Sequence, residues 1–269
     1  MVTHSKRRLD HLTAPEIQEA IQKTDLIFIP VGAIEPHGYH APMGTDNSIA
    51  LEIAEQAAAR CGGLVFPVLP LGNINLVYDF RYLPGSISIE PQILIDLYRN
   101  IGTELARSGF RRQIFVNGHS CNAALLAIAS FEIRERSGAE VGVLDWWTSA
   151  PELIEDIKGF NFASHSDEIE TSVLLATADR ELVDLAKAEI NSRTLEELSK
   201  DELLLYKAKV PFTRTLDPRW IGTAGNMGDP TLAKEEHGQR IIAKTVDVGF
   251  TLANVLAAQL QRSGLKASK

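Results

Sequence analysis

The 269-residue sequence contains only two cysteines, Cys61 and Cys121, which can form at most one disulfide. This scarcity excludes a small scaffold that depends on several disulfides, and it fits a reducing compartment such as the cytoplasm. Positively charged residues are also few, because the sequence has 27 Lys and Arg residues and 35 Asp and Glu residues, which gives a formal net charge of −8. Nucleic acids and anionic membrane surfaces are bound through basic faces, so the charge balance argues against both partners.

Long apolar runs are absent as well. No stretch reaches the length of a membrane span, and the short basic run at residues 6–8 is not followed by the apolar segment of a secretory signal. We therefore predict a cytoplasmic protein that acts on a small molecule and has no nucleic-acid or membrane partner.

The apolar content, at 45%, is sufficient for a substantial core. We expect one domain over residues 1–269, with about ten N-terminal and about six C-terminal residues flexible. Short apolar runs typical of buried strands occur at 26–31, 64–69, 112–116 and 141–144, and helical patterns cover 12–23, 46–60, 92–108, 123–137 and 231–260. This alternation predicts an α/β fold with a mostly parallel sheet that is covered by helices on both faces.

Polar residues follow three of the predicted strands at their carboxyl ends. Glu35 and His37 follow the first strand, His119 follows the third and Asp145 follows the fourth. Open α/β sheets bind ligands outside the carboxyl ends of their strands, so these side chains are expected to meet in one site. Asp46 begins the next helix and adds a further charged group from a rigid element.

The types of these residues point to a metal. Glu35 and His37 are two residues apart on an extended segment, so their side chains project to the same side and can converge on one cation. Mixed carboxylate and imidazole ligands suit zinc, manganese or another borderline divalent ion. The alternative is an ordinary polar loop with structural histidines. Three of the seven histidines, His37, His40 and His119, lie in short loops after strands, and this density favours a site.

The segment at residues 116–122 allows two interpretations. In the first, His119 is a metal ligand at a strand-to-helix turn. In the second, Ser120 is the nucleophile of a motif close to Gly-x-Ser-x-Gly, with an acid and His165 later in the chain. The serine-hydrolase hypothesis leaves the carboxylates and histidines of the first loop unexplained, so we favour the first interpretation. Cys121 as a nucleophile is weaker still, because a cysteine at a helix start is as readily a small buried residue.

The segment at residues 164–172 contains three acids beside a histidine and opens another predicted helix. His165 and Glu168 are three residues apart, hence on one face if the helix has begun, and can act as proton carrier and ligand. The alternative is an acidic first turn that is stabilised by the helix dipole.

Trp146 and Trp147 lie just past the fourth predicted strand. Core packing is the favoured interpretation for tryptophan, and stacking on a flat substrate is the alternative.

These segments together resemble the creatininase (creatinine amidohydrolase) family of metal-dependent hydrolases. The family pattern runs Gly-Ser/Ala-x-Glu-x-His-Gly-x-His-x-Pro and Thr-Asp, then Asn-Gly-His, then His-Ala-Gly-Glu-x-Glu-Thr-Ser. The matching residues here are Gly32 to Pro42, Thr45-Asp46, Asn117-Gly118-His119 and His165 to Ser172, with a later match at Gly228-Asp229-Pro230.

The resemblance implies a three-layer α/β/α sandwich and a site for two divalent metal ions, Zn or Mn, with Fe as a further option. By position, Asp46 is expected to bridge the ions. Glu35 and His119 are expected to bind one ion and His37 and Glu168 the other, and Glu168 is also expected to act in catalysis. His165 would transfer the proton. Family members form homo-oligomers, so a hexamer or a dimer is expected.

The implied activity is hydrolysis of a C–N bond in a cyclic amide or N-acyl small molecule by a metal-bound hydroxide. Several residues of the expected substrate pocket depart from the family pattern, and these departures argue against creatinine itself. We expect the pocket to include Tyr39, His40, Ser120, Cys121, Trp146, Trp147 and Asp167. One alternative is ring opening of a cyclic ketone or sugar-derived substrate, and another is a metal- or ligand-binding protein without catalysis.

Overall fold

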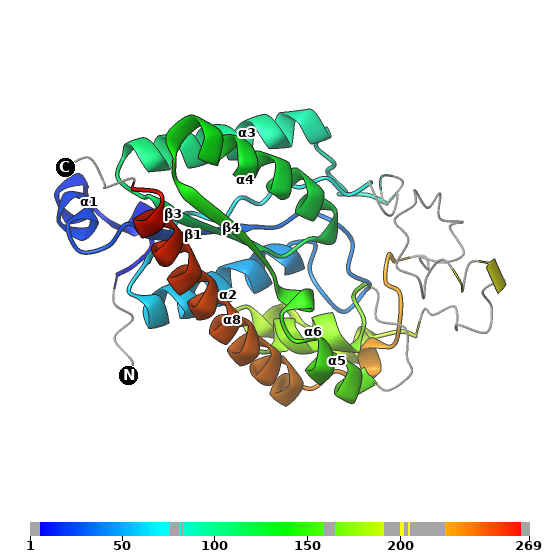
Figure 1. The fold of residues 1–269 in the computed structure, drawn as a ribbon. Coiled ribbons are helices and arrows are strands. Elements are labelled where there is room, and N and C mark those ends of the chain that lie inside the picture. The colour runs from blue at the N-terminus through cyan, green and yellow to red at the C-terminus, as the bar shows by residue number, and fades with distance from the viewer. Residues whose placement is uncertain are drawn as a thin grey trace.

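The computed structural model describes residues 6–75, 81, 83–158, 165–190, 200–201, 204 and 224–264. Four parallel strands form the central sheet in the order β2-β1-β3-β4 (Figure 1). They are β1 (Leu26–Val31), β2 (Leu64–Val65), β3 (Arg112–Asn117) and β4 (Glu140–Asp145). The chain moves from β1 to one neighbour, β2, and later to the other neighbour, β3. The strand order therefore changes direction between β1 and β3, which is where open α/β sheets bind ligands.

Helices cover both faces of this sheet, as Figure 1 shows. One face carries α1 (Ala14–Ile21), α3 (Pro91–Arg107) and α4 (Ala123–Ser137). The other carries α2 (Thr45–Cys61), α5 (Pro151–Lys158), α6 (Glu168–Leu175) and α8 (Glu235–Arg262). The chain thus has the predicted three-layer α/β/α architecture.

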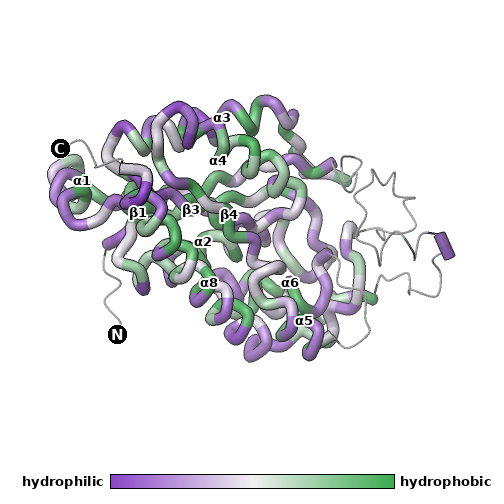
Figure 2. Tube along the Cα trace, in the orientation of Figure 1, coloured by the Kyte–Doolittle hydropathy of each residue, from purple (hydrophilic) through white to green (hydrophobic). Residues whose placement is uncertain are grey.

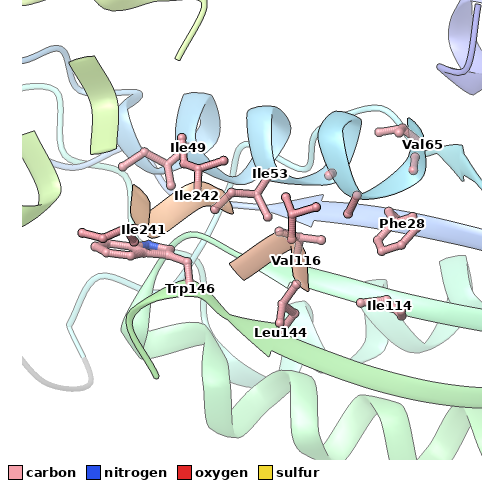
Figure 3. Close-up of a cluster of buried hydrophobic side chains, with 14 of the residues drawn as sticks. Phe28, Ile49, Ile53, Val65, Ile114, Val116, Leu144, Trp146, Ile241 and Ile242 are labelled. Atoms are coloured by element: carbon pink, nitrogen blue, oxygen red, sulfur yellow. The ribbon is translucent and has the colours of Figure 1, made fainter. Parts of the chain in front are cut away.

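The two faces of the sheet have separate hydrophobic cores, because successive side chains of a strand point to opposite sides. In β1, Phe28 packs toward α2 and α8, whereas Ile27 and Ile29 pack toward α3 and α4. Figure 3 shows the first of these cores, in which Ile53 of α2 lies over side chains of the strands. Both cores fix β1, whose carboxyl end leads directly into the loop that contains Glu35 and His37.

The helix α8 has the length and composition that would allow it to cross a membrane, and it is the one such helix among the described residues. The expectation that no stretch reaches the length of a membrane span was therefore wrong for this helix, by length and composition only. Hydrophobic and hydrophilic residues both occur along this helix in Figure 2. Its buried residues include Ile241 and Ile242, which belong to the core shared with α2 and the sheet. Core packing therefore accounts for part of the apolar content of α8, whereas Phe250 and Val255 of the same helix are exposed.

Three local features differ from the sequence-based expectation. The strand β2 ends at Val65, whereas the apolar run extends to Leu69, because Pro67 has no N–H for the sheet and interrupts the pairing. Helix α5 was missed, although its proline in the first turn is a start signal. At the N-terminus, Arg8 already forms a parallel bridge with Val65. Residues 1–5 and 265–269, where flexible ends were expected, lie outside the described ranges.

Candidate metal centre

The site forms at the carboxyl ends of β1 and β3, where these neighbouring strands end side by side with Val31 opposite Asn117. Gly118 then donates its N–H to the Val31 carbonyl at 2.8 Å and passes close to the first turn of α2. A Cβ on Gly118 would lie 2.2 Å from the Asp46 carbonyl oxygen, so only glycine permits this approach. The contact holds Asp46 beside the loops that follow both strands.

Buried carboxylates and imidazoles converge here in three overlapping groups. Each group has ligand atoms within 4.8 Å of one another: Glu35, Asp46 and His119; His37, Asp46 and Glu170; and Glu35, His37 and His165. Asp46 belongs to two groups through different oxygens, because Oδ1 lies 3.2 Å from His37 Nε2 and Oδ2 lies 3.1 Å from His119 Nδ1. One carboxylate therefore faces two possible cation positions.

The three histidines are oriented in the same way. Each places one ring nitrogen on a main-chain carbonyl oxygen: His37 Nδ1 on Glu35 at 3.0 Å, His119 Nε2 on Asn73 at 2.7 Å, and His165 Nε2 on Pro36 at 2.7 Å. A carbonyl oxygen only accepts hydrogen bonds, so that nitrogen must hold the ring proton. In the neutral ring, the other nitrogen then presents a lone pair to the carboxylates. Carbonyl partners of this kind are typical of histidines that bind metals.

The buried atoms that face the centre need a positive partner. Among the described residues, Glu35 Oε2, His37 Nε2 and Asp46 Oδ2 are buried and make no hydrogen bond. Lone pairs of a carboxylate and an imidazole repel each other at these distances unless a proton or a cation lies between them. Since buried charge without a partner is costly, the donor set fits divalent cations.

The pKa shifts of the buried side chains have the same origin. Burial alone would lower the pKa of His37, but the Asp46 and Glu170 carboxylates outweigh it and raise this pKa to about 9. Burial likewise opposes a charge on His119, yet Glu35 and Asp46 hold its pKa well above the ordinary value. Burial raises the pKa of Glu170 to about 8. The cavity therefore retains protons when no metal is present, as expected for a centre with strong negative potential.

His165 differs from the other two histidines. Its Nδ1 lies 3.6 Å from Glu170 Oε2 and 3.7 Å from Glu35 Oε1, beyond hydrogen-bond distance. Burial lowers its pKa, with the Glu35 carboxylate opposing the shift. The ring is therefore neutral near pH 7 and can accept a proton at Nδ1. Its role as the proton-transfer residue stays a prediction.

The structure brings Glu170, and not Glu168, into the ligand groups. The helix α6 begins at Glu168, with Asp167 as N-cap accepting from the N–H groups of Ile169 and Glu170. Two residues along a helix correspond to a rotation of about 200°, so Glu168 and Glu170 point to opposite sides. The prediction that His165 and Glu168 share one helix face assumed that the helix already includes His165. Ser166, which lies between His165 and the N-cap Asp167, has a left-handed backbone, so the helix does not extend back to His165.

A cavity of about 220 Å³ opens onto the centre. Its wall includes Ser120, Trp146, Trp147 and Asp167 from the predicted pocket, and it adds Gly118, Ile154 and Ile169 to four residues of the ligand groups. Trp146 is also part of the core, and its ring meets that of Trp147 edge-on at 5.8 Å between centroids. Ile154 comes from the unpredicted helix α5, so the sequence patterns did not reveal it.

Three residues of the predicted pocket are not part of this wall. Tyr39 is 53% exposed, and Cys121 is buried in the short helix that precedes α4. His40 is buried, and its Nε2 is 2.9 Å from Thr171 Oγ1, so it connects the β1 loop to α6. The residues nearest in sequence to a ligand are therefore not always the ones that face the cavity.

A buried carboxylate–imidazole centre at the switch point of an α/β/α sandwich places possible metal ligands where such folds bind their substrates, as metal-assisted hydrolysis requires. The model of the family described as creatinine amidohydrolase (creatininase) matches residues 10–252. The chain belongs to the creatininase family, as its sequence motifs indicated, and is a metal-dependent hydrolase of that family.

Curated relatives have more than one activity. A creatinine amidohydrolase of Pseudomonas putida is 30% identical over 65% of this chain and 72% of its own length. A 3-dehydro-scyllo-inosose hydrolase of Thermotoga maritima is 31% identical over 61% of this chain, and the match spans 54% of that relative. A mycofactocin precursor peptide peptidase of Mycobacterium ulcerans is 29% identical over 82% of the chain and 81% of its own length.

Solved structures agree with the family assignment. A creatininase with manganese has a TM-score of 0.77 and 25% identity, over 95% of this chain and 99% of that one. A mutant creatininase described as of Zn–Zn type gives the same values.

Proposed function

We propose that this protein hydrolyses a C–N bond in a cyclic amide or N-acyl small molecule, with two divalent ions, zinc or manganese, in the centre. The proposal rests on one observation, namely that Asp46 is shared by two ligand groups that lie beside a small cavity. Ions in these groups would lower the pKa of a bound water and polarise the substrate carbonyl.

The two groups that contain Asp46 define two sets of ligands. The third group shares Glu35 and His37 with these sets, and its His165 is assigned to proton transfer instead of metal binding. Glu35 and His119 would hold one ion, since Glu35 Oε1 and His119 Nδ1 are 2.9 Å apart. His37 and Glu170 would hold the other, since their Nε2 and Oε2 atoms are 3.5 Å apart. Asp46 gives one oxygen to each set. This assignment keeps the ligands expected from the family pattern, except that Glu170 takes the place of Glu168.

His165 is the proton carrier in this proposal. Its Nε2–H is fixed on the Pro36 carbonyl, so Nδ1 is the atom that exchanges protons. In amide hydrolysis, water adds its oxygen to the carbonyl carbon, the C–N bond breaks, and the nitrogen leaves with a proton. A neutral His165 Nδ1 can take the proton from water and return it to the nitrogen.

The cavity limits the substrate. A volume of about 220 Å³ fits a small molecule, and Trp146, Trp147 and Ile169 give it apolar surface beside the polar centre. A flat ring with one carbonyl group suits these walls. The relative from Pseudomonas putida is a creatinine amidohydrolase, and a related creatininase mutant was solved with creatine, which supports C–N bond chemistry on a small polar molecule.

A second candidate function is ring opening of a cyclic ketone or sugar-derived substrate in the same centre. It is favoured by the similarity to the Thermotoga maritima relative, which is a 3-dehydro-scyllo-inosose hydrolase. Product analysis separates the two functions, because C–N cleavage releases an amine and ring opening of a ketone releases a carboxylate without an amine.

The test is an assay of the metal-loaded protein on cyclic amides, N-acyl compounds and cyclic ketones, with detection of released amine and carboxylate. We expect amine release that His165→Ala abolishes while the metal content stays unchanged. Asp156→Ala, which changes an exposed acid on α5, is the control and should retain full activity. Loss of amine release only on Ser120→Ala, together with full activity after chelation, would instead favour the serine-hydrolase hypothesis. A His165→Ala variant with the same properties as the unmodified protein would favour a protein that binds metal without catalysis.

Self-association and a cytoplasmic location stay predictions. Exposed Ile93 and Leu97 on α3 and exposed Ile128 and Phe131 on the adjacent α4 support a homo-oligomer, either a dimer or a hexamer. Light scattering of the purified chain measures its mass in solution and would reveal a monomer if the prediction is wrong.

A further inference from the structure

Ser166 is the one non-glycine residue among the described residues that has a positive φ, at 50°. Left-handed backbone is unfavourable for a residue with a Cβ, and it persists where the surroundings determine it. Ser166 is 1% exposed and lies between His165 and the N-cap of α6. An unfavourable conformation at a buried residue beside the candidate centre calls for an explanation in terms of its contacts.

Those contacts join two ligands of the same group. The backbone N–H of Ser166 donates to Glu170 Oε2 at 2.6 Å, and the hydroxyl donates to the main-chain carbonyl of His37 at 2.7 Å. The hydroxyl is also 3.4 Å from His40 Nε2. The left-handed turn thus directs the N–H toward the start of α6 while the hydroxyl reaches the loop after β1.

We propose that Ser166 is a positioning residue that sets the spacing between His37 and Glu170 and thereby the affinity of the ion held by this pair. The inference rests on the proposed two-ion centre and deepens it. The ligand pair of Glu35 and His119 is held by other contacts, such as the one between His119 and the Asn73 carbonyl. Ser166 should therefore affect one ion and leave the other unchanged.

A structural role alone predicts a different pattern, and two substitutions distinguish the roles. Ser166→Ala removes the hydroxyl and retains the backbone cost, whereas Ser166→Gly removes the hydroxyl and also the cost of the left-handed backbone. If Ser166 served only stability, the glycine variant would approach the unmodified protein in both melting temperature and metal binding. If Ser166 positions the ligands, the glycine variant should melt at a higher temperature than the alanine variant. It should nevertheless bind the ion held by His37 and Glu170 as weakly as the alanine variant does.

The experiment uses the full chain freed of metal by a chelator and then titrated with Zn²⁺ in competition with a chromophoric chelator. Absorption spectra of Co²⁺-loaded protein report the coordination of each ion. We expect the dissociation constant of the ion held by His37 and Glu170 to rise about 10- to 100-fold in both variants, as for other residues that orient metal ligands. The dissociation constant of the ion held by Glu35 and His119 should stay unchanged. Ser172→Ala is the control, because this buried serine of α6 bonds the Glu168 carbonyl and the Lys234 N–H, away from the ligand groups.

Each outcome is decisive. The inference is overturned if both variants bind the ion held by His37 and Glu170 with unchanged affinity. It is also overturned if the affinity for both ions falls equally. If the alanine variant does not fold, the glycine variant decides alone. Fewer than two ions in the unmodified protein would instead overturn the proposed function, so the two failures are distinguishable.

Discussion

Gly118→Ala is the substitution whose effect follows most directly from the geometry of the centre. The added Cβ would lie 2.2 Å from the Asp46 carbonyl oxygen and 3.3 Å from the Ala50 Cβ. An ordinary carbon–oxygen contact is about 3.3 Å, so the first turn of α2 or the end of β3 must move by about 1 Å. This displacement falls on Asp46, the residue that both ligand groups share.

The size of the effect can be derived from that shift. Forcing one extra carbon into a packed interior costs about 1–3 kcal/mol of unfolding free energy. A misplacement of about 1 Å at a reacting centre costs about 100-fold in rate. Because Asp46 faces both cation positions, we expect weaker binding of both ions and an activity about 100-fold below that of the unmodified protein.

Gly44→Ala is the matched control. Gly44 precedes the same helix with φ of −98°, and its added Cβ would be no closer than 3.5 Å to the Asn47 side chain. We expect a loss of at most about 1 kcal/mol, from the weaker N-cap, and unchanged metal content. The free energies of unfolding of the two variants are compared by urea unfolding with and without metal. Their metal contents are compared by elemental analysis. Equal stability and equal metal content in the two variants would refute the claim that the close approach of Gly118 positions Asp46.

Three further predictions follow from single contacts. Glu170→Gln should lower the metal content measured by elemental analysis, whereas Glu168→Gln should leave it unchanged, and the reverse result would restore Glu168 as the ligand. Asp167→Ala removes the N-cap of α6 and should cost about 0.5–2 kcal/mol in urea unfolding, with Asn at this place retaining most of the stability. Ile53→Ala opens a cavity in the core between α2 and the sheet and should cost about 2–5 kcal/mol in the same assay, while a cost under 1 kcal/mol would contradict that packing.

Much of the fold could be predicted because its determinants are local. The β1 run has apolar residues throughout, as a strand buried on both faces requires, and both cores depend on it. The start of α2 near Asp46 and the turn after β3 at Gly118 follow from residue types at strand and helix ends. The apolar run at residues 64–69 did not predict the end of β2, because Pro67 interrupts the pairing and the strand ends at Val65.

The proposed ligand from α6 could not be predicted in the same way. Helical spacing from His165 selects Glu168, but Ser166 has a left-handed backbone, the helix begins only at Glu168, and Glu170 is the residue in the ligand groups. Non-glycine residues rarely adopt this conformation, so sequence patterns do not reveal it. The cavity wall is equally non-local, since Ile154 reaches it from a separate helix.

The most direct test of the two-ion centre is the number of metal ions bound per chain, measured by elemental analysis of the protein and of its Asp46→Asn variant after both are loaded with zinc or manganese. We expect about two ions per chain in the unmodified protein and loss of both in the variant, because each Asp46 oxygen faces a different ligand pair. Absence of metal, or two ions that persist in the Asp46→Asn variant, would contradict the shared-carboxylate centre.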